Sequence, residues 1–156
     1  MTNRLNVGDQ APELALSSSN GERVNLVNFQ GERVIVYFYP KAMTPGCTTE
    51  ARDFRDSLTE LNNAGYKVIG VSPDSVEKLV EFANQESLTF LLCSDTEKTV
   101  LTSWGAYGEK IKDGETVLGV IRSIVVVGND GKVELAQYDI KPDGAVTALR
   151  SALGIL

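Results

Sequence analysis

Strand-like and helix-like segments alternate along this chain, and the alternation restricts its fold more than any other feature. The run Arg33–Tyr39 (RVIVYFY) is β-branched and aromatic with no polar positions between, as expected for a strand covered on both faces. Further strands are predicted at Tyr66–Val71 and Phe90–Cys93. Buried strands that alternate with helices are typical of a sheet with helices packed against it.

Helical patterns fill the stretches between these strands. In the first stretch, the apolar residues that recur at spacings of three and four are Ala51, Phe54, Leu58 and Leu61. Gly65 marks the end of that helix. The second helix is predicted to begin at a capping box formed by Asp74 and Glu77, ahead of Leu79, Phe82 and Ala83. Shorter helical patterns lie at Val100–Trp104 and Ala145–Leu153.

Two turn signals predict antiparallel pairs at the margins of the sheet. Asn20-Gly21 separates Leu14–Leu16 from Val24–Leu26 and indicates a small N-terminal hairpin. A glycine-rich turn at 128–131 separates Ser123–Val127 from Val133–Tyr138 and indicates a second pair. We therefore predict an α/β protein with a thioredoxin-like architecture, in which helices flank a central mixed sheet. At 156 residues, positions 1–156 are expected to form one domain.

Charge and hydropathy exclude two classes of partner. Fifteen Lys and Arg against 21 Asp and Glu give a net charge of −6, the wrong sign for binding a phosphate backbone. The longest apolar run, Val34–Tyr39, is far shorter than the roughly 20 residues that span a bilayer. The first residues contain no apolar leader core, so a cytoplasmic location is expected. We expect neither a nucleic acid nor a membrane as partner.

The absence of histidine narrows the possible chemistry further. It removes imidazole bases, Ser/His/Asp triads, Cys/His dyads and most catalytic zinc sets. Two cysteines, Cys47 and Cys93, are too few for a disulfide framework or a four-thiolate metal site. Any reaction must therefore proceed without imidazole, and no metal site is predicted.

Cys47 is the candidate nucleophile. It lies in the segment Thr44–Glu50 (TPGCTTE), between a predicted buried strand and an amphipathic helix. Its sulfur is therefore expected near the helix N-terminus, where unpaired N–H groups and the positive end of the dipole stabilise a thiolate. The same loop leaves the carboxyl end of a central strand, where α/β sheets bind ligands. A free cysteine is more often a small buried hydrophobe, and Cys93, which ends an apolar run, fits that description.

Other loop signatures do not match. Thioredoxin-type exchange needs a second cysteine three positions away, and Cys47 has none there. A tyrosine-phosphatase loop would place an arginine six positions after the cysteine, where Asp53 stands, with Arg52 one position early. The segment also lacks the Gly-Lys-Ser/Thr ending of a phosphate-binding P-loop.

The segment Tyr37–Thr48 (YFYPKAMTPGCT) resembles the active-site segment of the peroxiredoxins, and most closely that of the bacterioferritin-comigratory-protein or PrxQ group. Further matching segments are Gly8–Pro12, Gly70–Asp74, Leu91–Asp95, Trp104–Glu109 and Gly119–Ser123. The resemblance implies a thiol-dependent peroxidase that reduces hydrogen peroxide and organic hydroperoxides without metal, flavin or other cofactor. It places the peroxidatic role on Cys47, with Pro40, Thr44 and Arg122 around it.

Each of these residues then has an expected role. The Cys47 thiolate attacks the peroxide and becomes a sulfenic acid, while the Thr44 hydroxyl orients the oxygens. Arg122 stabilises both the thiolate and the charge on the leaving oxygen. The backbone N–H groups of Gly46 and Cys47 add fixed dipoles, and Pro40 packs over the sulfur and excludes water.

The sequence departs from the family where a resolving cysteine is expected. One common position holds Arg52, and the other aligns with Ala83. Two routes remain: reduction of the sulfenic acid by an external thiol, which we favour, or pairing with Cys93 after local unfolding. The external reductant would be a thioredoxin, a glutaredoxin-like protein or a low-molecular-weight thiol. Alternative functions are a disulfide or arsenate reductase and a redox sensor that does not turn over. A monomer is expected.

Overall fold

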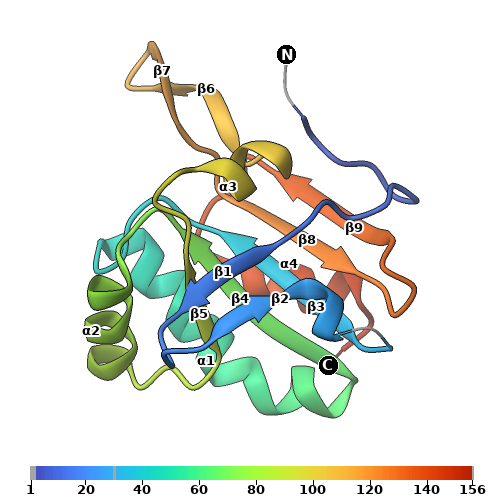
Figure 1. Ribbon diagram of the computed structural model, residues 1–156. Helices are drawn as coiled ribbons and strands as arrows, with labels where there is room; N and C mark the ends of the chain where they lie inside the picture. The colour runs from blue at the N-terminus through green and yellow to red at the C-terminus, as the bar shows by residue number, and fades with distance from the viewer. Residues whose placement is uncertain (1–2, 30, 156) are drawn as a thin grey trace.

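The computed structural model describes residues 3–29 and 31–155, and its main feature is a seven-stranded mixed sheet (Figure 1). The strand order is β2-β1-β5-β4-β3-β8-β9. The strands are β1 Ala15–Ser18, β2 Arg23–Asn25, β3 Arg33–Phe38, β4 Tyr66–Ser72, β5 Leu91–Ser94, β8 Ser123–Val127 and β9 Val133–Tyr138. The helices are α1 Pro45–Asn63, α2 Val76–Glu86, α3 Thr99–Ser103 and α4 Ala145–Ala152, with a 3-10 turn, η1, at Leu26–Phe29.

Parallel strands form the centre of the predicted mixed sheet. β3 pairs with β4, and β4 with β5, in parallel register. β8 runs antiparallel beside β3, and β9 pairs with β8 at the edge. The N-terminal hairpin of β1 and β2 is also confirmed, and β1 joins the sheet antiparallel to β5. The carboxyl ends of β3, β4 and β5 therefore lie at one edge of the sheet.

Alternation along the buried strands supplies two separate cores. Tyr37 and Tyr39 pack with α1, α2 and α4 on one face of the sheet. Val36 and Phe38 pack on the opposite face, with α3 and Trp104. A strand with apolar residues at every position can cover both cores at once, which explains why β3 shows no polar alternation.

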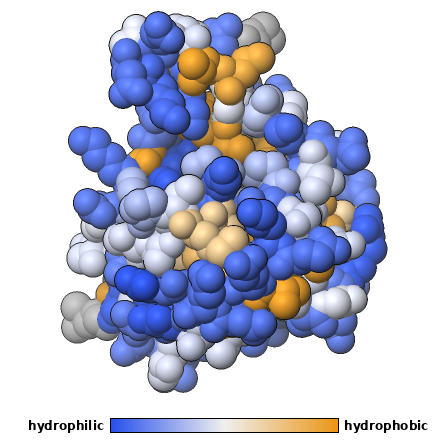
Figure 2. Space-filling model, turned by 90° about the vertical axis from the view of Figure 1, so that its left-hand side faces the viewer, coloured by the Kyte–Doolittle hydropathy of each residue, from blue (hydrophilic) through white to orange (hydrophobic). Residues whose placement is uncertain are grey.

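A second, two-stranded sheet was not predicted. It consists of β6 Tyr107–Lys112 and β7 Glu115–Val120, and it projects from the body of the molecule (Figure 1). Its turn is Asp113-Gly114, with φ of 54° and 81°, the positive values that a type I′ hairpin turn requires. Ile111 and Leu118 are 78% and 69% exposed on it, and Figure 2 shows hydrophobic surface on this projection.

The predicted capping box of α2 is wrong. The N-cap is Ser75, whose side chain accepts from the Lys78 N–H at 3.3 Å. Asp74, one residue earlier, instead directs its carboxylate to the backbone N–H of Ala42, at 2.7 Å. Asp74 and Ser75 are adjacent, and either residue type can cap a helix, so the sequence pattern is ambiguous. Asp74 does not cap α2 because it bonds Ala42, which is 32 residues away in the chain.

None of the helices in the described ranges is both long enough and apolar enough to cross a membrane.

Candidate active site

The local fold places Cys47 in the first turn of α1, as the sequence predicts. β3 ends at Phe38, and the next residue, Tyr39, still bonds β4 through its N–H to the Val71 carbonyl, at 3.1 Å. The chain then turns through Pro40–Thr44, and the helix begins with Pro45 at a position that needs no N–H donor. Cys47 is only 1% exposed, so its sulfur is held within the fold and close to the positive end of the helix.

Aromatic stacking fixes the direction of α1 against the sheet. The ring of Phe54 stacks on that of Tyr37 with centroids 4.4 Å apart, and Tyr37 stacks on Tyr39 at 5.3 Å. Phe54 lies two turns after Cys47 on the same helix face. The contact that buries Phe54 therefore also turns Cys47 toward the sheet.

Arg122 places a cation beside the Cys47 sulfur, from a part of the chain far from α1. It stands between β7 and β8, where the Ile121 N–H bonds the Ala106 carbonyl at 2.7 Å and the Ile140 N–H bonds the Arg122 carbonyl at 3.1 Å. Its Nη2 donates to the Cys47 sulfur at 3.4 Å. The family resemblance placed Arg122 near the sulfur, and the structure brings the two side chains together.

Glu50 extends the contact between Arg122 and Cys47 to a chain of three groups, and sequence reasoning missed it. Its Oε1 accepts from Arg122 Nη1 at 2.6 Å, while Oε2 has no hydrogen-bond partner among the described residues. The residue is fully buried. Burial raises the pKa of Glu50 to about 7, against the opposing effect of the Arg122 charge. A signal was available, because Glu50 falls on the apolar face of the helix between Cys47 and Phe54.

Glu50→Gln is expected to make the protein less sensitive to alkaline pH. The folded-state pKa of Glu50, about 7, lies above the ordinary value of 4.5, so the folded protein binds this proton more tightly. The stabilisation of the folded state by protonated Glu50 is complete below the pKa of this carboxyl in the unfolded chain, and it is lost as the pH rises through about 7. A shift of this size corresponds to at most about 3 kcal/mol.

Urea unfolding of the wild type and of Glu50→Gln at pH ~4 and pH ~8 measures this effect. As the pH rises from the lower to the higher value, the unfolding free energy of the wild type should fall relative to that of Glu50→Gln. The surface variant Glu134→Gln, whose carboxylate pairs with Arg33 and is 39% exposed, serves as the control. If the unfolding free energies of wild type and Glu50→Gln differ by the same amount at both pH values, the proposed titration of the buried Glu50 carboxyl is wrong.

The other predicted site residues lie in the loop before α1 and in the first turn of that helix. Thr44 is the N-cap of α1, and its hydroxyl donates to the Lys41 carbonyl at 2.8 Å, which leaves the oxygen able to accept. Pro40 is partly buried, two residues after the end of β3. Gly46 permits the close approach of its neighbours, because a Cβ there would lie 3.1 Å from Pro142 Cγ and 3.4 Å from Arg122 Nη2.

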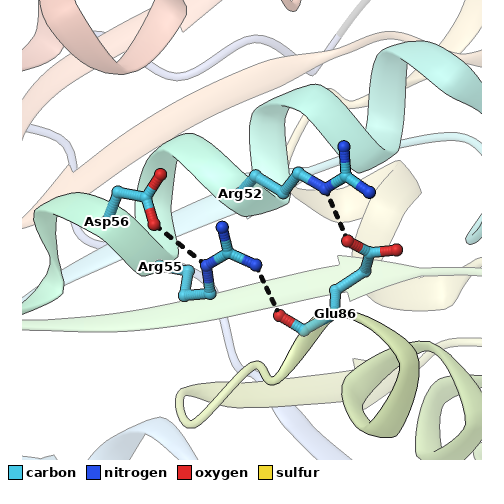
Figure 3. Close-up of polar contacts among 4 residues, drawn as sticks. All are labelled: Arg52, Arg55, Asp56 and Glu86. Carbon is cyan, nitrogen blue, oxygen red and sulfur yellow. Dashed lines mark hydrogen bonds and ion pairs between the residues drawn. The ribbon is translucent and has the colours of Figure 1, made fainter.

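Arg52 and Ala83 occupy the two positions at which relatives can carry a resolving cysteine, and they lie on α1 and α2 respectively. Arg52 is exposed on α1, and its Nε bonds Glu86 Oε1 on α2 at 2.6 Å (Figure 3). Arg55 reaches the Glu86 carbonyl at 2.9 Å and also pairs with Asp56 (Figure 3). Ala83 is partly buried on α2. The two arginines thus tie the surface of α1 to the end of α2.

Cys93 is separated from Cys47 by the sheet itself. Cys47 packs in the core beneath α1, whereas the Cys93 side chain lies in the core on the opposite face. Both cysteines are free and buried. Burial raises the pKa of Cys93 to about 12, which keeps its thiol protonated and unreactive at neutral pH.

Comparison with known proteins agrees with this geometry. The AhpC/TSA family model matches residues 7–136. A putative peroxiredoxin of Mycobacterium tuberculosis (strain ATCC 25618 / H37Rv) is 53% identical over 99% of this chain and 98% of its own length. Peroxiredoxin Bcp of Escherichia coli (strain K12) is 48% identical over 89% of each chain. The bacterioferritin comigratory protein of Xanthomonas campestris, described for its alkyl peroxide reduction activity, superposes with a TM-score of 0.86 at 35% identity over 96% of each chain.

These matches extend over nearly the whole chain and include its cysteine-bearing first helical turn. Peroxiredoxins are thiol-dependent peroxidases, which take a peroxide as oxidant and a thiol as reductant. Cys47, which lies beside Arg122 at the start of α1, falls within the matched residues. The chain therefore belongs to the AhpC/TSA family and is a peroxiredoxin of the bacterioferritin-comigratory-protein group.

Proposed function

We propose that Cys47 is the peroxidatic nucleophile. The observation that carries the proposal is the 3.4 Å contact between Arg122 Nη2 and the Cys47 sulfur in the first turn of α1. The thiolate attacks one oxygen of the hydroperoxide, the S–O bond forms as the O–O bond breaks, and the leaving oxygen takes up a proton. The products are the Cys47 sulfenic acid and water or an alcohol.

The neighbouring groups act on the charge that moves during this step. Negative charge shifts from the sulfur to the leaving oxygen, and the Arg122 guanidinium has donors enough to follow it. The backbone N–H groups of Gly46 and Cys47 lie in the first turn of α1, where the helix itself provides no carbonyl partner for them. Thr44 orients the peroxide through its hydroxyl, and Pro40 shields the sulfur from water.

We further propose a one-cysteine cycle in which an external thiol regenerates the enzyme. Positions 52 and 83 carry arginine and alanine, and Cys93 lies in the other core. An incoming thiol condenses with the sulfenic acid to a mixed disulfide and releases water; a second thiol then restores Cys47. A thioredoxin, a glutaredoxin-like protein or a low-molecular-weight thiol in the cytoplasm would supply these electrons. Because one chain provides every group of the site, we propose that a monomer is active.

Steady-state turnover tests this function. With dithiothreitol as reductant, the protein should consume many equivalents of hydrogen peroxide and of cumene hydroperoxide, an organic substrate of the class on which the Xanthomonas relative acts. Peroxide loss that stops after one equivalent would indicate a sensor rather than an enzyme. Reduction of a disulfide or of arsenate, with peroxide left untouched, would indicate a reductase.

A further inference from the structure

The loop that delivers Cys47 to the site is held in an unfavourable backbone conformation. Met43 has φ of 66°, in the left-handed region that long unbranched side chains seldom adopt. Its side chain packs against the core beneath α1, so the residue is not simply a free turn. Such a conformation persists only where the surroundings enforce it.

Asp74 provides the constraint. Its Oδ2 accepts from the N–H of Ala42, the residue before Met43, at 2.7 Å, and from the Ser72 hydroxyl at 2.8 Å. Ala42 is buried, so its N–H depends on this partner. Asp74 is therefore placed to hold the loop.

Asp74 is itself fixed by two strands. Its own N–H donates to the Ser72 hydroxyl at 3.3 Å, and Ser72, at the end of β4, is fully buried. The Ser94 hydroxyl, at the end of β5, donates to the Asp74 carbonyl at 2.5 Å. Because β3, β4 and β5 are parallel, all three ends lie at one edge, and Asp74 joins them at the entrance to α1. Helix capping does not explain the residue, since Ser75 performs it.

We propose that Asp74 is a positioning residue for Cys47: by accepting the Ala42 N–H, it holds the Pro40–Thr44 loop so that α1 begins with the sulfur beside Arg122. This inference rests on the proposed role of Cys47. It requires an acceptor oxygen at Asp74 rather than a negative charge. It acts through the backbone of the loop and not through contact with the peroxide.

Three variants test the proposal through the second-order rate constant for hydrogen peroxide, measured by stopped flow. Asp74→Ala should lower it at least ~10-fold, because the buried Ala42 N–H is left without its acceptor. Asp74→Asn keeps a carbonyl oxygen that can accept both bonds and should stay within ~3-fold of the wild type. Ser75→Ala removes the adjacent α2 cap and should lower the thermal midpoint without changing the rate. Equal rates for wild type and Asp74→Ala would overturn the inference.

Amide hydrogen exchange gives a readout that does not depend on activity. The Ala42 N–H should be protected in the wild type and in Asp74→Asn, and should exchange at least ~10-fold faster in Asp74→Ala. Free exchange of Ala42 in the wild type contradicts the proposal even if Asp74→Ala fails to fold. A wild type with no peroxidase activity but a protected Ala42 would refute the proposed function and leave the hydrogen bond standing.

Relief of the strain at Met43 provides a rescue. Asparagine adopts the left-handed region more readily than methionine, so Met43→Asn lowers the cost of the loop conformation. The rate loss caused by Asp74→Ala should therefore be smaller in the Met43→Asn background, ~3-fold rather than ~10-fold. An equal loss in both backgrounds would show that Asp74 does not act through this loop.

Discussion

Replacement of Cys47 by serine is expected to abolish peroxide reduction. A hydroxyl in the first turn of α1 does not ionise near neutral pH, so the nucleophile is lost while the fold is kept; serine is well tolerated at helix starts. We expect the second-order rate constant for hydrogen peroxide to fall at least ~1,000-fold, or about 4 kcal/mol in the barrier. Stopped-flow mixing with peroxide, with circular dichroism to verify the fold, measures the effect.

The matched control is Cys93→Ser, the same chemical change on the other face of the sheet. That variant places a hydroxyl in an apolar core, so its thermal midpoint should fall, but its rate constant should stay within ~3-fold of the wild type. An active Cys47→Ser protein would remove Cys47 from the reaction. An inactive but folded Cys93→Ser protein would show that Cys93 takes part.

Replacement of Arg122 by methionine is expected to lower the rate constant at least ~10-fold at neutral pH, or about 1.4 kcal/mol. Methionine keeps an unbranched apolar chain like the stem of arginine but has no charge and no donor. The variant therefore loses the 3.4 Å contact to the sulfur and the cation that follows the leaving oxygen. Competition against a second peroxidase for limiting hydrogen peroxide measures the rate constant.

Glu50 makes a second control necessary. Without Arg122, its fully buried carboxyl has lost its only partner within the described residues, and that loss could distort the site by itself. The double variant Arg122→Met with Glu50→Gln removes the unpaired acid. Its rate should remain as low as that of Arg122→Met. Recovery to the wild-type rate would show that Arg122 serves only to satisfy Glu50.

Local signals in the sequence were sufficient to place Cys47. An unbroken apolar run predicted β3, and a proline and glycine ahead of the cysteine, followed by apolar residues at helical spacing, predicted the start of α1. The alternation of strands with helices and both predicted antiparallel pairs followed from the same kind of pattern. These features depend on neighbours a few residues apart in the chain.

The partners of Cys47 depend on the tertiary fold and were harder to predict. Arg122 is 75 residues from Cys47, and it was assigned by family resemblance alone. The hairpin that precedes Arg122 was overlooked although Asp113-Gly114 is a strong turn signal, because its strands carry charges among the apolar residues. In the sequence, Glu50 looks like an ordinary helix residue and Asp74 like an ordinary helix cap. Only their bonds to residues far away in the chain show that they have other roles.

The proposed mechanism depends on the formation of a sulfenic acid on Cys47, and mass spectrometry of the trapped protein detects it. The reduced protein is treated with one equivalent of hydrogen peroxide in the presence of dimedone, which adds to sulfenic acids, and is then digested. We expect the adduct on the peptide that contains Cys47 and an unmodified thiol at Cys93. An adduct on Cys93, or a disulfide between the two cysteines in place of the adduct, would contradict the account.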